Sequence, residues 1–359
     1  MKILFHLGHP AHFHLFKNII RRFEGEGVST HIIIKDKDVL IDLLEDFGLP
    51  YINILPEGKS SGRWGLVKDL VKRGSRIIAY CKTHKPDLLI GTSADISYVG
   101  KYLGIPAINV QEDDASVVPL HAWISYPWAT SILSPVSCDN GRWNRKTVKY
   151  PGYHELAYLH PDHFTPKKEV VAQYTDPEKP FFIFRFASLN AHHDEGVRGI
   201  NDAIAEELIA RLKPSGRILI TSERELAPNL EPYRLPVNPA DMHHMLAFAN
   251  LVIGDSQTMS AESAVLGTPY IRFNDFVGKI GYLRELEETY QLGYGILPDH
   301  PDRMISKATE LAENKETQDI FRKRREKMLS ERINTADFLF DHISSFLNGK
   351  ANPYIQQTS

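Results

Sequence analysis

Short apolar runs alternate with amphipathic segments along most of this chain. In the first half, the spacing of apolar positions and the residue types predict strands at 2–7, 30–35, 51–55, 88–90, 107–110 and 131–133. Between them lie segments with helical spacing, of which the longest covers about 64–82. A proline-punctuated stretch follows, and strands are then predicted again at 181–186, 217–221, 251–253 and 270–273. From Pro298 onward the pattern is almost entirely helical and ends in a helix at about 335–347.

Strands that alternate with helices predict parallel sheets covered by helices on both faces. The break in the pattern divides the chain into two such α/β units, each Rossmann-like and doubly wound. We expect domains at 1–155 and 156–334, followed by a C-terminal helix and tail at 335–359. Ligands of doubly wound sheets bind outside the carboxyl ends of the strands, so candidate site residues are sought there.

The segment 251–273, LVIGDSQTMSAESAVLGTPYIRF, combines a buried strand, a polar turn, a short helix and a second strand. The start of such a helix offers unpaired N–H groups and the positive end of the helix dipole, where diphosphates bind. We therefore expect Ser256, Gln257 and Thr258 to contact phosphates, and Glu262, one turn further, to accept hydrogen bonds from a ribose. The alternative is an ordinary capped helix with a solvated Glu262, and in either case alanine at position 262 should barely affect folding.

This segment resembles the nucleotide-sugar-binding core of the GT-B glycosyltransferases, notably the lipid II-forming N-acetylglucosaminyltransferases, and of the UDP-N-acetylglucosamine 2-epimerases. The residues that carry the resemblance are Asp241, Met242, Ser256, Met259, Glu262, Gly267 and Pro269. The whole chain is most similar to a bacterial and archaeal family catalogued as domain of unknown function 354. The resemblance implies a GT-B-like fold, with two Rossmann-like domains facing a central cleft and a C-terminal helix crossing back, and it implies no cofactor.

The loop after the first strand contains a candidate general base. His12 lies where the lipid II-forming enzymes carry a His at the end of their Gly-rich loop, so the resemblance implies a catalytic role for it. Imidazole titrates near neutral pH, which suits a general base. A helix cap or a buried core His is the alternative, and we prefer it for His9 and His14. This loop has the single glycine Gly8 where those transferases have several.

Arg185 ends the first strand of the second domain, where a guanidinium suits bidentate contact with a diphosphate. The family of domain of unknown function 354 carries a similar run of residues after this Arg. This resemblance implies that Ser188, His193 and Asp194 bind the donor. His192, His193 and Asp194 are also potential metal ligands. Neighbouring residues on one loop rarely converge on one ion, however, and no metal is expected.

Two carboxylates follow strands of the first domain. The 2-epimerases place carboxylates at similar points to handle a proton of the sugar, so Asp95 and Glu112 are candidate catalytic residues. Capping of the next helix is the alternative for Asp95. In the resembling transferases, the place of Met242 lies beside the uracil. The alternative for Met242 is a core position shared with Met245.

Composition excludes some classes of function. With 42 Lys and Arg against 45 Asp and Glu, a net charge of −3 gives no electrostatic reason to bind nucleic acid. The two cysteines have no metal-ligand spacing and predict free thiols in a reducing compartment, so we expect a cytoplasmic protein. The N-terminal stretch is too short for a signal peptide, and no apolar run predicts a membrane span.

Two features point to the acceptor. The segment 120–128 gathers two Trp and a Tyr, and the long helix near 64–82 carries Lys68, Lys72, Arg73 and Arg76. Together they predict peripheral contact with the inner membrane leaflet, although core aromatics and a solvated basic face explain each feature alone.

The predicted function is that of a glycosyltransferase, which moves a sugar from a UDP-sugar donor to a glycan or lipid-linked acceptor in cell-surface polysaccharide synthesis. An isomerase of the 2-epimerase type is the first alternative. A non-catalytic nucleotide-sugar-binding protein is the second.

Overall fold

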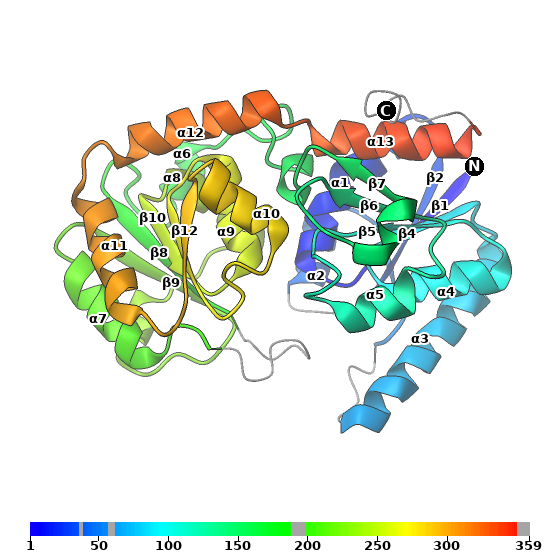
Figure 1. The fold of residues 1–359 in the computed structure, drawn as a ribbon, viewed down its shortest axis with the longest axis horizontal. Coiled ribbons are helices and arrows are strands. Elements are labelled where there is room, and N and C mark those ends of the chain that lie inside the picture. Colours follow the sequence, from blue (N-terminus) through cyan, green and yellow to red (C-terminus); the bar gives the residue numbers. More distant parts are fainter. Residues whose placement is uncertain (36–38, 57–61, 188–197, 350–359) are drawn as a thin grey trace. The chain divides into compact units, whose positions relative to one another are not determined.

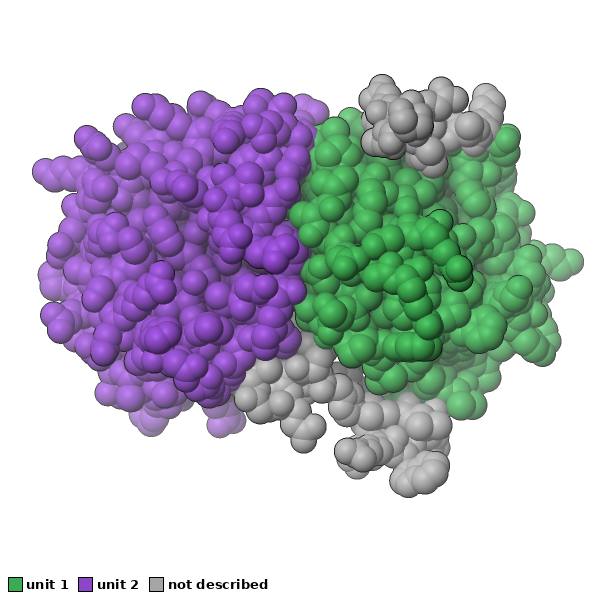
Figure 2. All heavy atoms as spheres, viewed as in Figure 1, with its two compact units in different colours: residues 1–158, 333–359 green, residues 159–332 purple. Residues whose placement is uncertain are grey.

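The chain folds into two compact units, each built on one parallel sheet (Figure 1). The structure is a computed structural model and describes residues 1–35, 39–56, 62–187 and 198–349, with the backbone alone for 62–68. Unit 1 comprises residues 1–158 and 333–359, and unit 2 comprises residues 159–332 (Figure 2). In the described ranges no helix has both the length and the apolar character that a bilayer span requires.

The sheet of unit 1 has seven strands in the order β3-β2-β1-β4-β5-β6-β7, and all its pairings are parallel. The strands are β1 (Lys2–Leu7), β2 (Ser29–Ile34), β3 (Ile52–Asn53), β4 (Leu88–Gly91), β5 (Ala107–Val110), β6 (Ser131–Pro135) and β7 (Thr147–Tyr150). The helices are α1 (Pro10–Gly25), α2 (Leu40–Asp46), α3 (Gly62–His84), α4 (Ala94–Leu103), α5 (Pro119–Ser125), η1 (Gly141–Lys146), η2 (His154–Ala157) and α13 (Thr335–Leu347). The strand order reverses direction between β1 and β4, which makes their carboxyl ends the switch point of this sheet.

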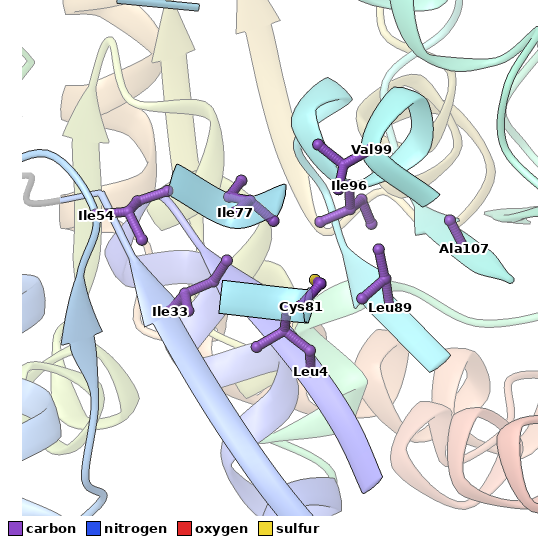
Figure 3. Packing of buried hydrophobic residues seen from close by; sticks show 9 residues of the cluster. All are labelled: Leu4, Ile33, Ile54, Ile77, Cys81, Leu89, Ile96, Val99 and Ala107. Atoms are coloured by element: carbon purple, nitrogen blue, oxygen red, sulfur yellow. The ribbon is translucent and has the colours of Figure 1, made fainter. Parts of the chain in front are cut away.

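One face of this sheet is covered by α3 and α4. Alternate strand residues point to this face, and they pack against apolar residues of the two helices (Figure 3). The buried cluster consists of Leu4, Ile33, Ile54, Ile77, Cys81, Leu89, Ile96, Val99 and Ala107. This close packing holds β1 and β4 in place against the two helices.

The C-terminal helix α13 packs on α1 within unit 1. The rings of Phe23 and Phe340 lie 4.5 Å apart, and Arg22 forms a 2.8 Å ion pair with Asp337. The chain therefore ends in the unit in which it begins, as the GT-B resemblance implies.

The sheet of unit 2 has five parallel strands in the order β12-β11-β10-β8-β9. The strands are β8 (Phe181–Phe186), β9 (Arg217–Ser222), β10 (Leu251–Gly254), β11 (Tyr270–Phe273) and β12 (Gly293–Ile296). The helices are α6 (Lys168–Val171), α7 (Asp202–Leu212), η3 (Glu231–Tyr233), η4 (Pro239–Asp241), α8 (Met242–Phe248), α9 (Gln257–Leu266), α10 (Gly281–Arg284), the π-helix η5 (Glu285–Thr289), α11 (Pro301–Glu313) and α12 (Thr317–Glu331). Here the switch point lies between β8 and β10.

The two parallel sheets are predicted correctly from the sequence, whereas β7, β12, α5 and the π-helix are missed. The missed strand β12 contains Gly293 and Gly295, and glycine is depleted in strands. Its neighbours require the glycines: a Cβ on Gly293 would lie within 2.4 Å of the Tyr270 ring, and one on Gly295 would lie 2.6 Å from Glu287. The glycines of β12 are therefore explained by the close packing of Tyr270 and Glu287, although glycine disfavours strands.

Candidate functional site

In unit 2, the switch point places β8, β10 and the start of α9 side by side. Gly254 of β10 pairs with Arg185 of β8, and a Cβ on Gly254 would lie 2.5 Å from the Arg185 carbonyl oxygen. Only glycine allows the two strands to approach this closely, so the chain turns into α9 directly beside Arg185.

The start of α9 offers donors to an anion. Ser256 is the N-cap, and its hydroxyl oxygen accepts the N–H of Met259 at 3.3 Å. The backbone N–H groups of Gln257 and Thr258 have no acceptor among the residues that the structure describes. Ser256, Gln257 and Thr258 are all half-buried. The three residues predicted to contact phosphates therefore lie on one helix start, with donors directed away from the helix.

Arg185 supplies a cation beside this helix start. Its Nη1 donates to Thr221 Oγ1 at 3.0 Å, and its Nη2 is paired with Glu223. The Nε–H is buried and has no acceptor among the described residues. A buried donor without an acceptor costs folding free energy, which is recovered when a ligand supplies an oxygen.

The carboxylate of Asp255 ties the two strand ends together. It is buried between Gly254 and the N-cap, and its Oδ1 accepts the N–H of Ala187 at 2.6 Å. Asn274 Nδ2 holds the Asp255 carbonyl oxygen at 2.8 Å. Burial raises the pKa of Asp255 to about 6, against the lowering effect of its backbone hydrogen bonds.

This raised pKa gives unit 2 a pH-dependent stability. As pH rises from 3.8, the unfolded chain loses the Asp255 proton first, and the folded protein keeps it until about pH 6. The fold therefore loses stability across this window and stays less stable above it, by about 3 kcal/mol. Asp255→Asn keeps an acceptor for Ala187 and removes the charge. In urea titrations its advantage over the wild type should grow across the window and then level off; an advantage independent of pH would contradict this account.

Glu262 lies inside α9 and is 4% exposed, bonded to the neighbouring helix α8. Its Oε1 is 2.9 Å from Nε2 of His243, which is also buried. Met242, the half-buried first residue of α8, precedes this His. Alanine at position 262 would remove this hydrogen bond between two buried side chains, so we now expect it to lower the stability of unit 2, in contrast to the expectation from sequence.

Three predicted donor contacts, Ser188, His193 and Asp194, lie outside the described residues, as does the alternative metal ligand His192. Elsewhere in the chain, where the structure does describe the residues, no group of three or more His, Cys, Asp and Glu side chains is arranged to hold a metal ion.

In unit 1, His12 lies at the switch point between β1 and β4. Its Nδ1 accepts the N–H of Gly8 at 3.1 Å. Thr92 Oγ1, at the end of β4, lies 2.8 Å from Nε2 and 2.9 Å from Nδ1. Because Nδ1 already accepts a hydrogen bond, the neutral ring carries its proton on Nε2 and donates it to Thr92.

Gln111 extends this network from the end of β5. Its side-chain amide donates to the backbone oxygen of Thr92 and lies 3.0 Å from Nε2 of His121. Burial lowers the pKa of His121 to about 4, so its ring is neutral at pH 7 and can accept this hydrogen bond. The side chain of Gln111 thus ties the end of β5 to the end of β4, beside His12.

Asp95, on α4, is held by an ion pair inside unit 1. Arg73 Nε lies 2.8 Å from its Oδ2, and the Tyr98 hydroxyl donates to its Oδ1 at 2.9 Å. Burial raises the pKa of Asp95, but the hydrogen bonds and charge of Arg73 outweigh it and leave the pKa below its usual value. A carboxylate paired in this way is a poor proton acceptor.

Glu112 follows Gln111 and remains half-buried. Its Oε2 lies 3.3 Å from Nδ1 of His154, a residue of η2. Burial lowers the pKa of His154 to about 4, so this ring is neutral at pH 7. Glu112 is therefore a carboxylate with a neutral imidazole beside it, which suits proton transfer more than the ion pair at Asp95 does.

A model of the family described as "Protein of unknown function (DUF354)" matches residues 1–279. An uncharacterised protein of Methanocaldococcus jannaschii is 25% identical over 288 residues, which are 74% of this chain and 79% of that protein.

Several solved structures share this fold. A putative UDP-N-acetylglucosamine 2-epimerase from Listeria monocytogenes aligns with a TM-score of 0.71 at 14% identity, covering 98% of both chains. The UDP-GlcNAc 2-epimerase of Methanocaldococcus jannaschii, crystallised with UDP-GlcNAc and UDP, aligns with a TM-score of 0.66 at 15% identity, covering 97% of this chain and 100% of that one. The calicheamicin glycosyltransferase CalG4 aligns with a TM-score of 0.59 at 12% identity, covering 97% and 98%. These likenesses confirm the predicted GT-B-like fold.

Proposed function

The chain belongs to the DUF354 family, as its sequence predicts, and we propose that it is a glycosyltransferase that uses a UDP-sugar donor. The observation that carries the proposal is the group of donors at the switch point of unit 2. The N–H groups of Gln257 and Thr258 lie on the helix start that follows β10, and Arg185 lies near the end of the adjacent strand β8. Among the residues that the structure describes, neither these N–H groups nor the Nε–H of Arg185 has an acceptor. Helix N-termini and guanidinium groups both favour a diphosphate.

The donor's nucleoside would contact α8 and α9. Glu262 accepts hydrogen bonds from the ribose hydroxyls, and His243 acts as a positioning residue that fixes the orientation of the carboxylate. Met242 lies against the base. Ser188, His193 and Asp194 remain further proposed donor contacts.

His12 of unit 1 serves as the general base. The acceptor hydroxyl oxygen attacks the anomeric carbon, the bond from that carbon to the diphosphate breaks, and the hydroxyl proton moves to Nδ1. This nitrogen must first release the N–H of Gly8. The imidazolium that forms keeps its Nε2–H on Thr92, and the leaving UDP is stabilised by Arg185 and the α9 N–H groups.

The pairing of Asp95 favours a transferase over a 2-epimerase. An epimerase would use both Asp95 and Glu112 to move a proton of the sugar, whereas Asp95 is bound to Arg73 and Tyr98. Glu112, with His154 beside it, is the one observation that supports the isomerase as a second candidate.

An exchange experiment separates the two reactions. With UDP-N-acetylglucosamine in deuterated water and no acceptor, a 2-epimerase incorporates deuterium at C2 of the sugar, because its chemistry passes through loss of that proton. After incubation with this protein, we expect mass spectrometry of the recovered UDP-N-acetylglucosamine to show no deuterium at C2. Incorporation that Glu112→Gln abolishes and His12→Ala preserves would overturn the transferase proposal.

The acceptor we propose is a glycan or lipid-linked glycan of cell-surface polysaccharide synthesis, reached from the cytoplasmic face of the membrane. The aromatic segment 120–128 is the feature that supports a lipid-linked acceptor.

A further inference from the structure

An exposed aromatic patch lies on α5 of unit 1. Leu120 and Trp123 are three residues apart on this helix, and Trp128 follows its C-terminal end, where its N–H donates to the Ser125 backbone oxygen. Their exposed fractions are 70%, 59% and 47%, respectively. Ala122 and Tyr126, from the same segment, belong to a buried hydrophobic cluster, which holds this segment in place. We call these three exposed residues the α5 patch.

Cations surround the α5 patch. The Arg142 guanidinium lies 3.7 Å from the centre of the Trp123 ring. Lys146 donates to the backbone oxygens of Tyr126 and Pro127, next to Trp128. Arg145 directly precedes Lys146 on η1, and the charges of Arg145 and Lys101, after burial, lower the pKa of Lys146. Lys101 lies on α4, which packs against α5 (Figure 1).

No carboxylate within the described ranges forms an ion pair with Lys101, Arg142, Arg145 or Lys146. Two of the basic positions predicted on α3 have partners within unit 1: Arg73 binds Asp95, and Arg76 donates to the backbone oxygen of Ile54. The side chain of Lys68 lies outside the described residues. The cations described beside the tryptophans come from α4 and η1.

Exposed tryptophans beside cations that form no ion pair among the described residues suit an anionic lipid surface. Trp rings bind at the level of lipid headgroups, and Lys and Arg are attracted to anionic leaflets. A second copy of the chain fits less well, because a two-fold contact would bring the same cations against one another. We propose that the α5 patch and its four cations dock unit 1 on an anionic membrane surface. The inference does not depend on the UDP-sugar site, since binding to vesicles needs no nucleotide.

Co-sedimentation with vesicles tests this proposal. The full chain should sediment with vesicles that contain phosphatidylglycerol and remain in solution with phosphatidylcholine alone. Lys101→Glu and Arg145→Glu should each lower partitioning at least fivefold, since each cation near an anionic leaflet contributes about 1 kcal/mol. Trp123→Ala should lower it further. The matched controls in unit 2 are the exposed residues Lys279 and Leu297, and Lys279→Glu and Leu297→Ala should bind like the wild type.

Three results would overturn the proposal. The first is equal binding to neutral and anionic vesicles, and the second is charge-reversal variants that bind as the wild type does. The third is a wild-type protein that does not bind vesicles and self-associates, together with a Trp123→Ala variant that is monomeric. The α5 patch would then be a subunit interface. Binding of UDP measured on the same variants should be unchanged, which separates this outcome from a failure of the proposed function.

Discussion

Replacing His12 with alanine is expected to lower the rate of UDP release from the UDP-sugar donor by about 10²- to 10⁴-fold, the usual contribution of a general base. With water as the acceptor, the reaction can be followed without knowing the natural glycan. Donor affinity should change little, because His12 belongs to unit 1 and the diphosphate donors belong to unit 2. The effect should therefore fall on kcat and not on KM.

A neighbouring His provides the control. His9 is the N-cap of α1, and its Nδ1 accepts the N–H of Ala11 at 3.2 Å. His9→Asn keeps a side-chain acceptor at this position and should release UDP at nearly the wild-type rate. If His12→Ala is as active as His9→Asn while Glu112→Gln is inactive, the catalytic group of unit 1 is Glu112.

The second large effect concerns the stability of unit 2. Arg272 on β11 is fully buried, and its guanidinium binds the Glu287 carboxylate of the π-helix through Nε at 3.0 Å and Nη2 at 2.9 Å. Glu287→Ala leaves this cation buried and unpaired, so the free energy of unfolding should fall by about 3–5 kcal/mol. Nη1 of Arg272 also contacts Asn274, which holds the Asp255 backbone, so UDP binding should weaken as well.

Glu288 is the matched control, because it is the next residue on the same π-helix and is exposed. Glu288→Ala should change the free energy of unfolding by less than about 0.5 kcal/mol in urea. A Glu287→Ala protein that unfolds at the same urea concentration as Glu288→Ala would show that the buried pair contributes nothing. In the double variant Arg272→Met, Glu287→Leu, stability should return towards that of the wild type, because no charge is left buried.

Local patterns in the sequence predict the sheet alternation and the position of Arg185 and Ser256–Thr258 at strand ends. These features depend on period, capping and turn residues within a few positions of one another. The strand order of unit 2 could not be read in this way, because β10 pairs with β8 although β9 lies between them in the chain. The hydrogen bond from Ala187 to Asp255, which follows from this pairing, was therefore not predicted.

Contacts between distant parts of the chain also explain why the partners of two carboxylates, Asp95 and Glu262, were not predicted. Sequence analysis gives Asp95 a catalytic or a capping role, and neither includes Arg73, which α3 brings to it from 22 residues away. Glu262 was expected to contact a ribose, with a solvated side chain as the alternative, and neither expectation includes His243, against which the packing of α8 on α9 buries it. Residue type and spacing identify a chemically useful side chain, and only the tertiary structure shows which partner already binds it.

Calorimetric titration with UDP of the wild type and of Glu262→Gln tests the central claim most directly. Gln keeps the shape and an oxygen for His243 but lacks the charge, so the thermal midpoint should stay close to that of the wild type. A charge-assisted hydrogen bond contributes about 1.5–3 kcal/mol, so the variant should bind UDP about tenfold or more weakly. UDP lacking a ribose hydroxyl should bind the wild type less tightly, and the difference should shrink in the variant. Equal affinity of the two proteins for UDP would refute the ribose contact, and a wild type that binds no UDP would contradict the proposed function as a whole.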